Sequence, residues 1–81
     1  MRVTVRLFAR LKDLAGTAEL VREVPGPATV QTVWQSLKTE MPSLSEYEGT
    51  MSVAVNAEYA RMGADVHDGD EVAFLPPVSG G

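Results

Sequence analysis

The residues with the clearest chemical potential are the last two of the sequence, Gly80 and Gly81, which we expect to present a free carboxylate. Glycine has no Cβ, so this backbone can enter a narrow slot that other residues would block. Pro76 and Pro77 fix φ and disfavour helix, which predicts an extended, flexible tail over residues 76–81 beside a domain of residues 1–75. At about 3.3 Å per residue, this tail reaches roughly 20 Å. It is suited to threading into another protein's active site; the alternative is an incidental frayed terminus.

The rest of the chain offers no complete active site. The absence of cysteine excludes disulfides, thiolate metal sites and a thiol nucleophile. No Gly-rich phosphate-binding motif is present. His67 is the only histidine, with no second ligand for a metal site and no cysteine or obvious serine to activate. Asp68 and Asp70 indicate a turn around Gly69 rather than a calcium site, which needs further oxygen ligands. We therefore expect no metal site, and the Gly81 carboxylate as the one distinctive reactive group.

Length, charge and composition limit the kinds of partner that the chain can bind. A chain of 81 residues predicts one domain, and its net charge of −4 argues against binding the nucleic acid backbone. No apolar run approaches the ~18 residues that would span a membrane, and we expect no targeting segment and a cytoplasmic location. The acidic residues are concentrated in the second half. They form either a solvated surface or a patch that steers the domain towards a basic partner.

Hydrophobic periodicity predicts one helix and a mixed sheet. The stripe of Val30, Val33, Trp34, Leu37 and Met41 indicates an amphipathic helix over residues 29–41. Runs of alternating or apolar residues, bounded by turn signals, predict strands over residues 2–8, 17–24, 51–55, 58–61 and 71–75. The order ββαβββ predicts an α+β domain, with one crossing helix packed on the sheet.

Strand phase places two apolar residues beside the tail. In the first strand Phe8 falls on the polar face next to Arg6, where it is either covered by a loop or available to a partner. In the last strand Phe74 points inward and Leu75 outward. If these strands are parallel neighbours, Phe8 and Leu75 lie together where the tail departs, which predicts a docking surface.

Three segments resemble the small subunit of molybdopterin synthase, the MoaD type of the ubiquitin-like sulfur carriers. They are residues 5–11 followed by Gly16, the pair Val55-Asn56, and the C-terminal run of residues 68–81. The resemblance covers essentially the whole chain, and the C-terminal run is its most specific part. Leu75 departs from the pattern, because relatives often carry a second aromatic residue there.

The resemblance implies a β-grasp fold and a carrier without an active site of its own. An adenylating enzyme of the MoeB type would use ATP and magnesium to activate Gly81, and a sulfur donor protein would convert it to a thiocarboxylate. The tail would then enter a large subunit of the MoaE type and donate sulfur to cyclic pyranopterin monophosphate. The assembled complex would be the sulfurtransferase, and this chain would bind no cofactor. The residues expected to contact partners are Phe8, Leu75, Pro76, Pro77, Val78, Ser79 and Gly80.

Other functions remain open at this point. A carrier of the same fold could serve thiamin, cysteine or tRNA thiolation, although the run from Pro76 to Ser79 favours the molybdopterin client. A ubiquitin-like modifier would instead be conjugated to lysines through Gly81. A plain interaction domain would not need Gly81 at all.

Overall fold

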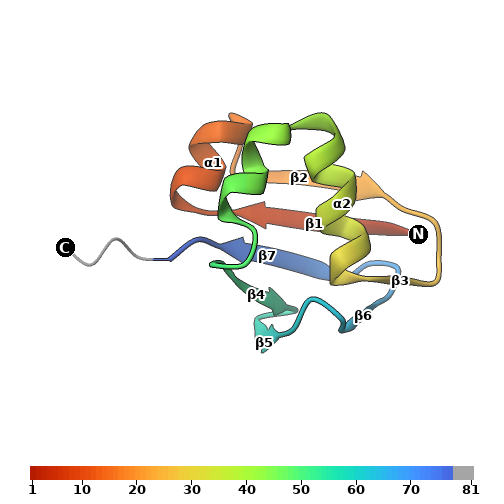
Figure 1. The fold of residues 1–81 in the computed structure, drawn as a ribbon. Coiled ribbons are helices and arrows are strands. Elements are labelled where there is room, and N and C mark those ends of the chain that lie inside the picture. Colours follow the sequence, from red (N-terminus) through yellow and green to blue (C-terminus); the bar gives the residue numbers. More distant parts are fainter. Residues whose placement is uncertain (78–81) are drawn as a thin grey trace.

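The computed structural model describes residues 1–77 and is organised around a five-stranded mixed sheet with strand order β2-β1-β7-β4-β5 (Figure 1). These strands are β1 (Arg2–Leu7), β2 (Glu19–Glu23), β4 (Ser52–Val55), β5 (Glu58–Ala60) and β7 (Glu71–Leu75). The helices are α1 (Ala9–Ala15), α2 (Val30–Glu40) and the 3₁₀ helix η1 (Pro42–Tyr47). A separate two-stranded sheet pairs β3 (Ala28–Thr29) with β6 (Asp65–Val66). The predicted β-grasp arrangement is confirmed.

Strands β1 and β7 are parallel neighbours inside the sheet, and this pairing positions the last described residues. Strand β1 pairs antiparallel with β2, and β7 pairs antiparallel with β4. Because β1 and β7 run in the same direction, both end at the same edge of the sheet, and the described part of the chain continues from β7 at that edge as far as Pro77 (Figure 1). The N-terminus lies at the opposite edge.

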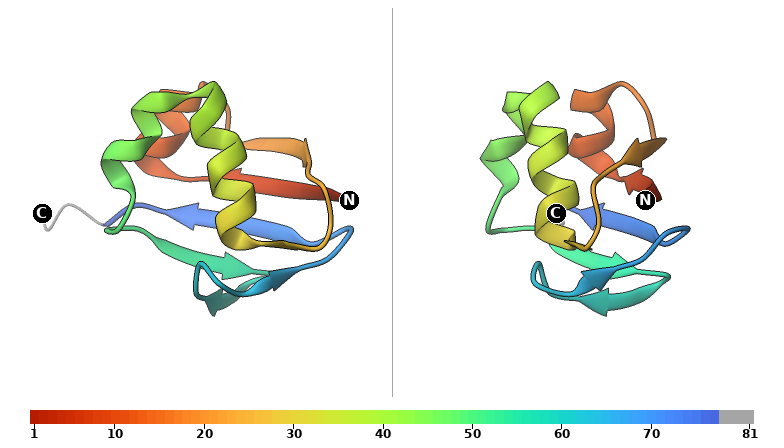
Figure 2. Two further views of the ribbon diagram at one scale, coloured as in Figure 1. Left: turned by 45° about the vertical axis from the view of Figure 1, so that its right-hand side comes forward. Right: turned by 90° about the vertical axis from the view of Figure 1, so that its right-hand side faces the viewer.

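Helices α1 and α2 lie on the same face of the sheet (Figure 2). The predicted stripe of α2 forms the centre of the core, since Val30, Val33, Trp34 and Leu37 are fully buried. The sheet contributes its inward residues to the same core: Val3, Val5, Leu7, Val53, Val72 and Phe74. The helices therefore cover one face, and the opposite face carries the polar and exposed residues of the same strands.

The ends of α2 are set by local chemistry. The Thr29 side chain accepts a hydrogen bond from the Thr32 backbone N–H, and the Thr32 side chain accepts one from the Thr29 backbone N–H. This reciprocal capping satisfies backbone donors that have no partner within the helix. The helix ends before Pro42, as predicted, because the residue preceding a proline disfavours the α region.

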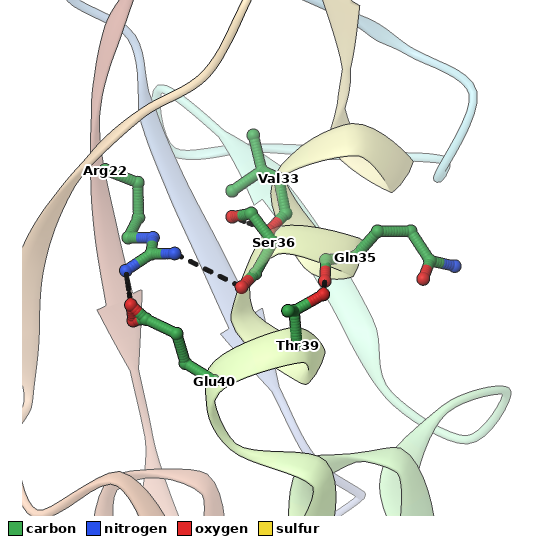
Figure 3. A network of polar contacts seen from close by, with 6 residues as sticks. All are labelled: Arg22, Val33, Gln35, Ser36, Thr39 and Glu40. Carbon is green, nitrogen blue, oxygen red and sulfur yellow. Dashed lines mark hydrogen bonds and ion pairs between the residues drawn. The ribbon is translucent and has the colours of Figure 1, made fainter.

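Arg22 is the charged residue that breaks the inward pattern of β2. It pairs with buried Val3 in the register and therefore lies on the helix face of the sheet. Its Nη1 donates to both carboxylate oxygens of Glu40 at 2.7 and 2.6 Å, and its Nη2 donates to the Ser36 carbonyl at 3.2 Å (Figure 3). The guanidinium thus joins the edge strand to the last turns of α2.

Four short elements add to the predicted order. The segment after β1 forms α1, whose Leu11 is buried and whose C-cap Gly16 has φ +77°, a conformation that glycine adopts without strain. The polar segment that follows α2 forms η1, which buries Leu44. Strands β3 and β6 are two residues each, too short for alternation to reveal.

Among residues 1–77, no helix combines the length and apolar character needed to cross a membrane.

Candidate functional site

Phe8 and Leu75 lie together at the edge where the tail begins, as the strand phase predicts. Leu7 of β1 pairs with Phe74 of β7, and both side chains are buried against the helices. The residue that follows each of them, Phe8 after Leu7 and Leu75 after Phe74, faces away from this core. Phe8 is 37% exposed, Leu75 is half-buried, and the two residues line the same two hollows. Their proximity is confirmed, and their role as partner contacts stays a prediction.

The first hollow lies at the tail exit and has a largely apolar lining. Its walls come from the end of β1, the start of α1, the end of β7 and the helix η1. The lining residues are Phe8, Ala9, Arg10, Tyr47, Leu75, Pro76 and Pro77. Pro76 is half-buried and Pro77 is exposed, so the first tail residues form part of this surface. Tyr47 was not predicted here, because no sequence signal indicated that η1 would bring it to the tail.

The second hollow lies on the outer face of the sheet. It is lined by Arg6, Phe8, Ala54, Ala57, Tyr59, Glu71, Ala73 and Leu75. Sequence reasoning also missed Tyr59, which is 83% exposed. The available signal was the phase of the β4–β5 hairpin: Val53 is buried, so its neighbour Ala54 faces outward, and Tyr59 pairs with Ala54.

One basic side chain, that of Arg6, lines the second hollow. The Arg6 guanidinium lies over the Phe8 ring, with its Cζ 5.7 Å from the ring centroid. Its Nη1 is 3.9 Å from the Glu71 carboxylate, beyond hydrogen-bonding distance. The site therefore combines exposed aromatic surface with a loosely held positive charge.

The predicted turn around Gly69 lies at the other end of β7, away from the tail. The Asp70 carboxylate accepts hydrogen bonds from the Asn56 side-chain amide at 3.0 Å and the His67 backbone N–H at 2.8 Å. These hydrogen bonds, with Asn56 as the larger contributor, lower the pKa of Asp70 because they favour its ionised form. The Asp68 carboxylate accepts a hydrogen bond from the Arg2 backbone N–H.

These contacts identify the Asp68–Asp70 segment as a structural turn. Both carboxylates accept hydrogen bonds from the protein. Within residues 1–77, no group of three or more potential ligands is placed to hold a metal ion. The His67 side chain is 79% exposed, and its Nδ1 lies 3.8 Å from the Asp70 carboxylate. Calcium binding receives no support from this geometry.

The remaining predicted site residues are Val78, Ser79, Gly80 and Gly81, which lie outside the described residues. The described part therefore ends at Pro77, with the apolar surface of Phe8, Leu75 and Tyr47 beside it.

The sequence and the fold of this chain are both similar to those of known proteins. The chain matches the family model described as the ThiS family over residues 5–81. It is 37% identical over 81 residues to the molybdopterin synthase sulfur carrier subunit of Arabidopsis thaliana, covering 100% of this chain and 84% of that protein. The crystal structure of SAMP1 from Haloferax volcanii is similar, with a TM-score of 0.89, 34% identity and 100% coverage of both chains.

A further similar chain comes from a protein–protein complex. This is the complex of subunits 1 and 2 of the molybdopterin-converting factor from Helicobacter pylori 26695, matched with a TM-score of 0.70 and 26% identity. The match covers 100% of this chain and 100% of that chain.

Proposed function

The chain belongs to the ThiS family, and we propose that it is the sulfur-carrier subunit of a molybdopterin synthase. The full-length similarity to the Arabidopsis thaliana sulfur carrier subunit supports this function. The structural observation that supports it is the surface at the end of β7. Pro76 and Pro77, which follow β7, line one hollow with Phe8, Tyr47 and Leu75, and the sequence after Pro77 ends in Gly80-Gly81.

The chemistry follows from the Gly81 carboxylate. A carboxylate resists nucleophilic attack until it becomes a mixed anhydride, here an acyl-adenylate formed with release of pyrophosphate. Sulfur at the sulfide oxidation level, supplied through a donor protein, then displaces AMP and leaves a thiocarboxylate. This group is a nucleophilic sulfur that needs no cysteine, which suits a chain that has none. Its sulfur bonds to cyclic pyranopterin monophosphate in the large subunit, and hydrolysis of the acyl carbon–sulfur bond then returns Gly81 to a carboxylate.

Adenylation and binding of the pterin take place on partner proteins. A MoeB-type enzyme supplies the adenylating site with its ATP and magnesium, and the MoaE-type large subunit supplies the pocket for the pterin. This chain binds no cofactor and acts in the cytoplasm. The similar chain in the Helicobacter pylori complex of subunits 1 and 2 supports the large subunit as a partner. Binding through Phe8, Leu75 and Tyr59 would direct the tail into either partner.

Reconstitution tests the proposal directly. The protein is incubated with the activating enzyme, ATP, magnesium and a sulfur donor, and then with the large subunit and cyclic pyranopterin monophosphate. We expect molybdopterin to form with the full chain and not with a variant that lacks Gly81. Normal sulfur transfer by the truncated variant would contradict the carrier function.

A protein modifier is the second candidate. Small archaeal modifier protein 1 of Haloferax volcanii is 36% identical, covering 94% of this chain and 97% of that protein. A modifier would carry Gly81 in an amide bond to a lysine of another protein. Mass spectrometry of tryptic peptides from cell extracts separates this outcome from a thiocarboxylate on the free chain.

A further inference from the structure

We infer that Arg6 selects the docking partner: its guanidinium pairs with a carboxylate that the large subunit presents to the outer face of the sheet. The inference rests on the proposed function, because it assumes that the surface formed by the two hollows binds that subunit. The proposed function describes this surface only by its apolar residues. The inference adds one charged contact, for which the partner must supply a carboxylate.

The position of Arg6 makes it central to the surface. In the sheet register it lies between Glu19 of β2 and Ala73 of β7, on the face not covered by helices. It lines the same hollow, of about 310 Å³, as Phe8 and Tyr59. A protein surface that contacts the aromatic residues of this hollow therefore also meets the Arg6 side chain.

The guanidinium is poorly satisfied within the chain. Its closest charged contact is the Glu71 carboxylate at 3.9 Å, and the described residues 1–77 offer its side chain no hydrogen bond. A guanidinium has five N–H donors, and with 44% of the side chain exposed these are left to water. The Phe8 ring beneath it supplies a cation–π contact but no acceptor.

Docking removes this water. Burial of a charged group is unfavourable unless a hydrogen-bonded partner of opposite charge replaces the solvent. A carboxylate matches the planar fork of arginine with two parallel hydrogen bonds, which an isolated carbonyl does not. The large subunit should therefore place an Asp or Glu opposite Arg6, surrounded by apolar side chains that contact Phe8 and Tyr59.

The charges of the chain argue against a polyanionic occupant. The hollow contains one guanidinium beside the Glu71 carboxylate, and the whole chain has a net charge of −4. Nucleic acid binding needs several phosphate contacts, each supplied by a basic group. A single protein carboxylate fits this hollow better.

Binding kinetics with the purified large subunit of the same organism test the inference. Arg6→Met keeps most of the side-chain volume and removes the charge, so we expect affinity to fall at least about tenfold, mainly through faster dissociation. The dependence of affinity on salt should also weaken. Arg2→Met is the matched control, because Arg2 lies on the same face of β1, pairs with Glu23 and is outside the hollow. It should change affinity less than about twofold.

Two further variants separate the possible failures. Glu71→Gln removes the carboxylate that competes for Arg6, so the affinity for the large subunit should be equal or higher. A loss of affinity as large as that of Arg6→Met would mean that Glu71, and not the partner, pairs with Arg6 in the complex. That result would overturn the inference. Wild-type affinity for Arg6→Met, alongside weakened binding by Phe8→Ala, would also overturn it while leaving the docking surface intact. If neither variant weakens binding, the docking surface itself is wrong. Unfolding curves confirm that each variant is folded.

Discussion

The indole ring of Trp34 on α2 packs against the ring of Phe74 on β7, with centroids 5.0 Å apart and planes inclined by 45°. Both side chains are fully buried. Because side chains alternate along a strand, this contact commits the next residue, Leu75, to the opposite face. The core of the domain thus determines which residues lie exposed at the point where the tail begins.

The register of α2 can be tested by truncating Leu37, which is fully buried one turn after Trp34. Leu37→Ala should lower the free energy of unfolding by about 2–5 kcal/mol, because it removes buried apolar contacts and leaves a cavity. Denaturant unfolding monitored by Trp34 fluorescence measures the change. Val21→Ala is the control, since Val21 is 54% exposed on β2 and should change stability by less than about 0.5 kcal/mol. A similarly small loss for Leu37→Ala would show that the register is wrong.

The docking role of Phe8 predicts a loss of binding without a loss of folding. Phe8→Ala should weaken the complex with the large subunit by more than about 1 kcal/mol, as truncation of contact aromatics often does. Titration calorimetry measures the affinity, and Val21→Ala again provides an exposed apolar control outside both hollows. A variant that unfolds would instead place Phe8 in the core and remove the argument from strand phase.

The turn at Asp70 predicts a pH-dependent contribution to stability. Asp70 has a pKa below its ordinary value of 3.8 in the folded protein, so its ionised form stabilises the fold. This contribution is fully present above the unfolded-state pKa and is lost as the pH falls through the folded-state pKa. Asp70→Asn should therefore lower the free energy of unfolding at pH 7, because an amide group cannot accept both hydrogen bonds.

The measurement for Asp70 is a series of denaturant unfolding curves at decreasing pH. The difference between wild type and Asp70→Asn should shrink as the pH falls from the ordinary aspartate range, about 4, towards the lower folded-state pKa of Asp70, because the wild-type carboxylate then becomes protonated. Asp65→Asn is a suitable control, because the exposed Asp65 side chain makes no hydrogen bond within the described residues. A difference that stays constant with pH would show that ionised Asp70 does not stabilise the fold.

The parts of the site predicted from sequence are those with strong periodicity. Alternation in β1 and β7 was enough to place Phe8 and Leu75, because one buried face determines the direction of every side chain in a strand. Tyr47 and Tyr59 were missed for different reasons. Tyr47 depends on a 3₁₀ helix whose polar sequence resembles a loop, and Tyr59 lies on a three-residue strand whose face is visible only once its pairing with β4 is known.

We expect changes at Gly80 and Gly81 to block thiocarboxylate formation by the activating enzyme. Removing Gly81, or adding one residue after it, shifts the carboxylate by about 3.3 Å. Misplacement by about 1 Å can already slow a reaction on the order of a hundredfold. Gly80→Val keeps the carboxylate in register but adds a branched side chain to a backbone that must enter a narrow site. All three variants should fold normally and fail to form the thiocarboxylate in the presence of activating enzyme, ATP and sulfur donor.

These tail variants distinguish two requirements of the activating site: the position of the carboxylate and the size of the side chain at residue 80. Ser79→Ala is a mild control, because it removes a hydroxyl without moving the carboxylate or adding volume. Efficient thiocarboxylation of Gly80→Val would show that the activating site is not a narrow slot. Efficient activation of the variant lacking Gly81 would remove the requirement for register.

The central claim is that Gly81 carries sulfur, and the mass of the intact protein isolated from its own cells tests it most directly. Replacement of one carboxylate oxygen by sulfur raises the mass by about 16 Da. We expect a fraction of the chain to carry this increment, located on the C-terminal peptide and lost after incubation with the large subunit and cyclic pyranopterin monophosphate. A chain found only as the carboxylate, or only in amide linkage to lysine, in cells that are making molybdopterin would contradict the account.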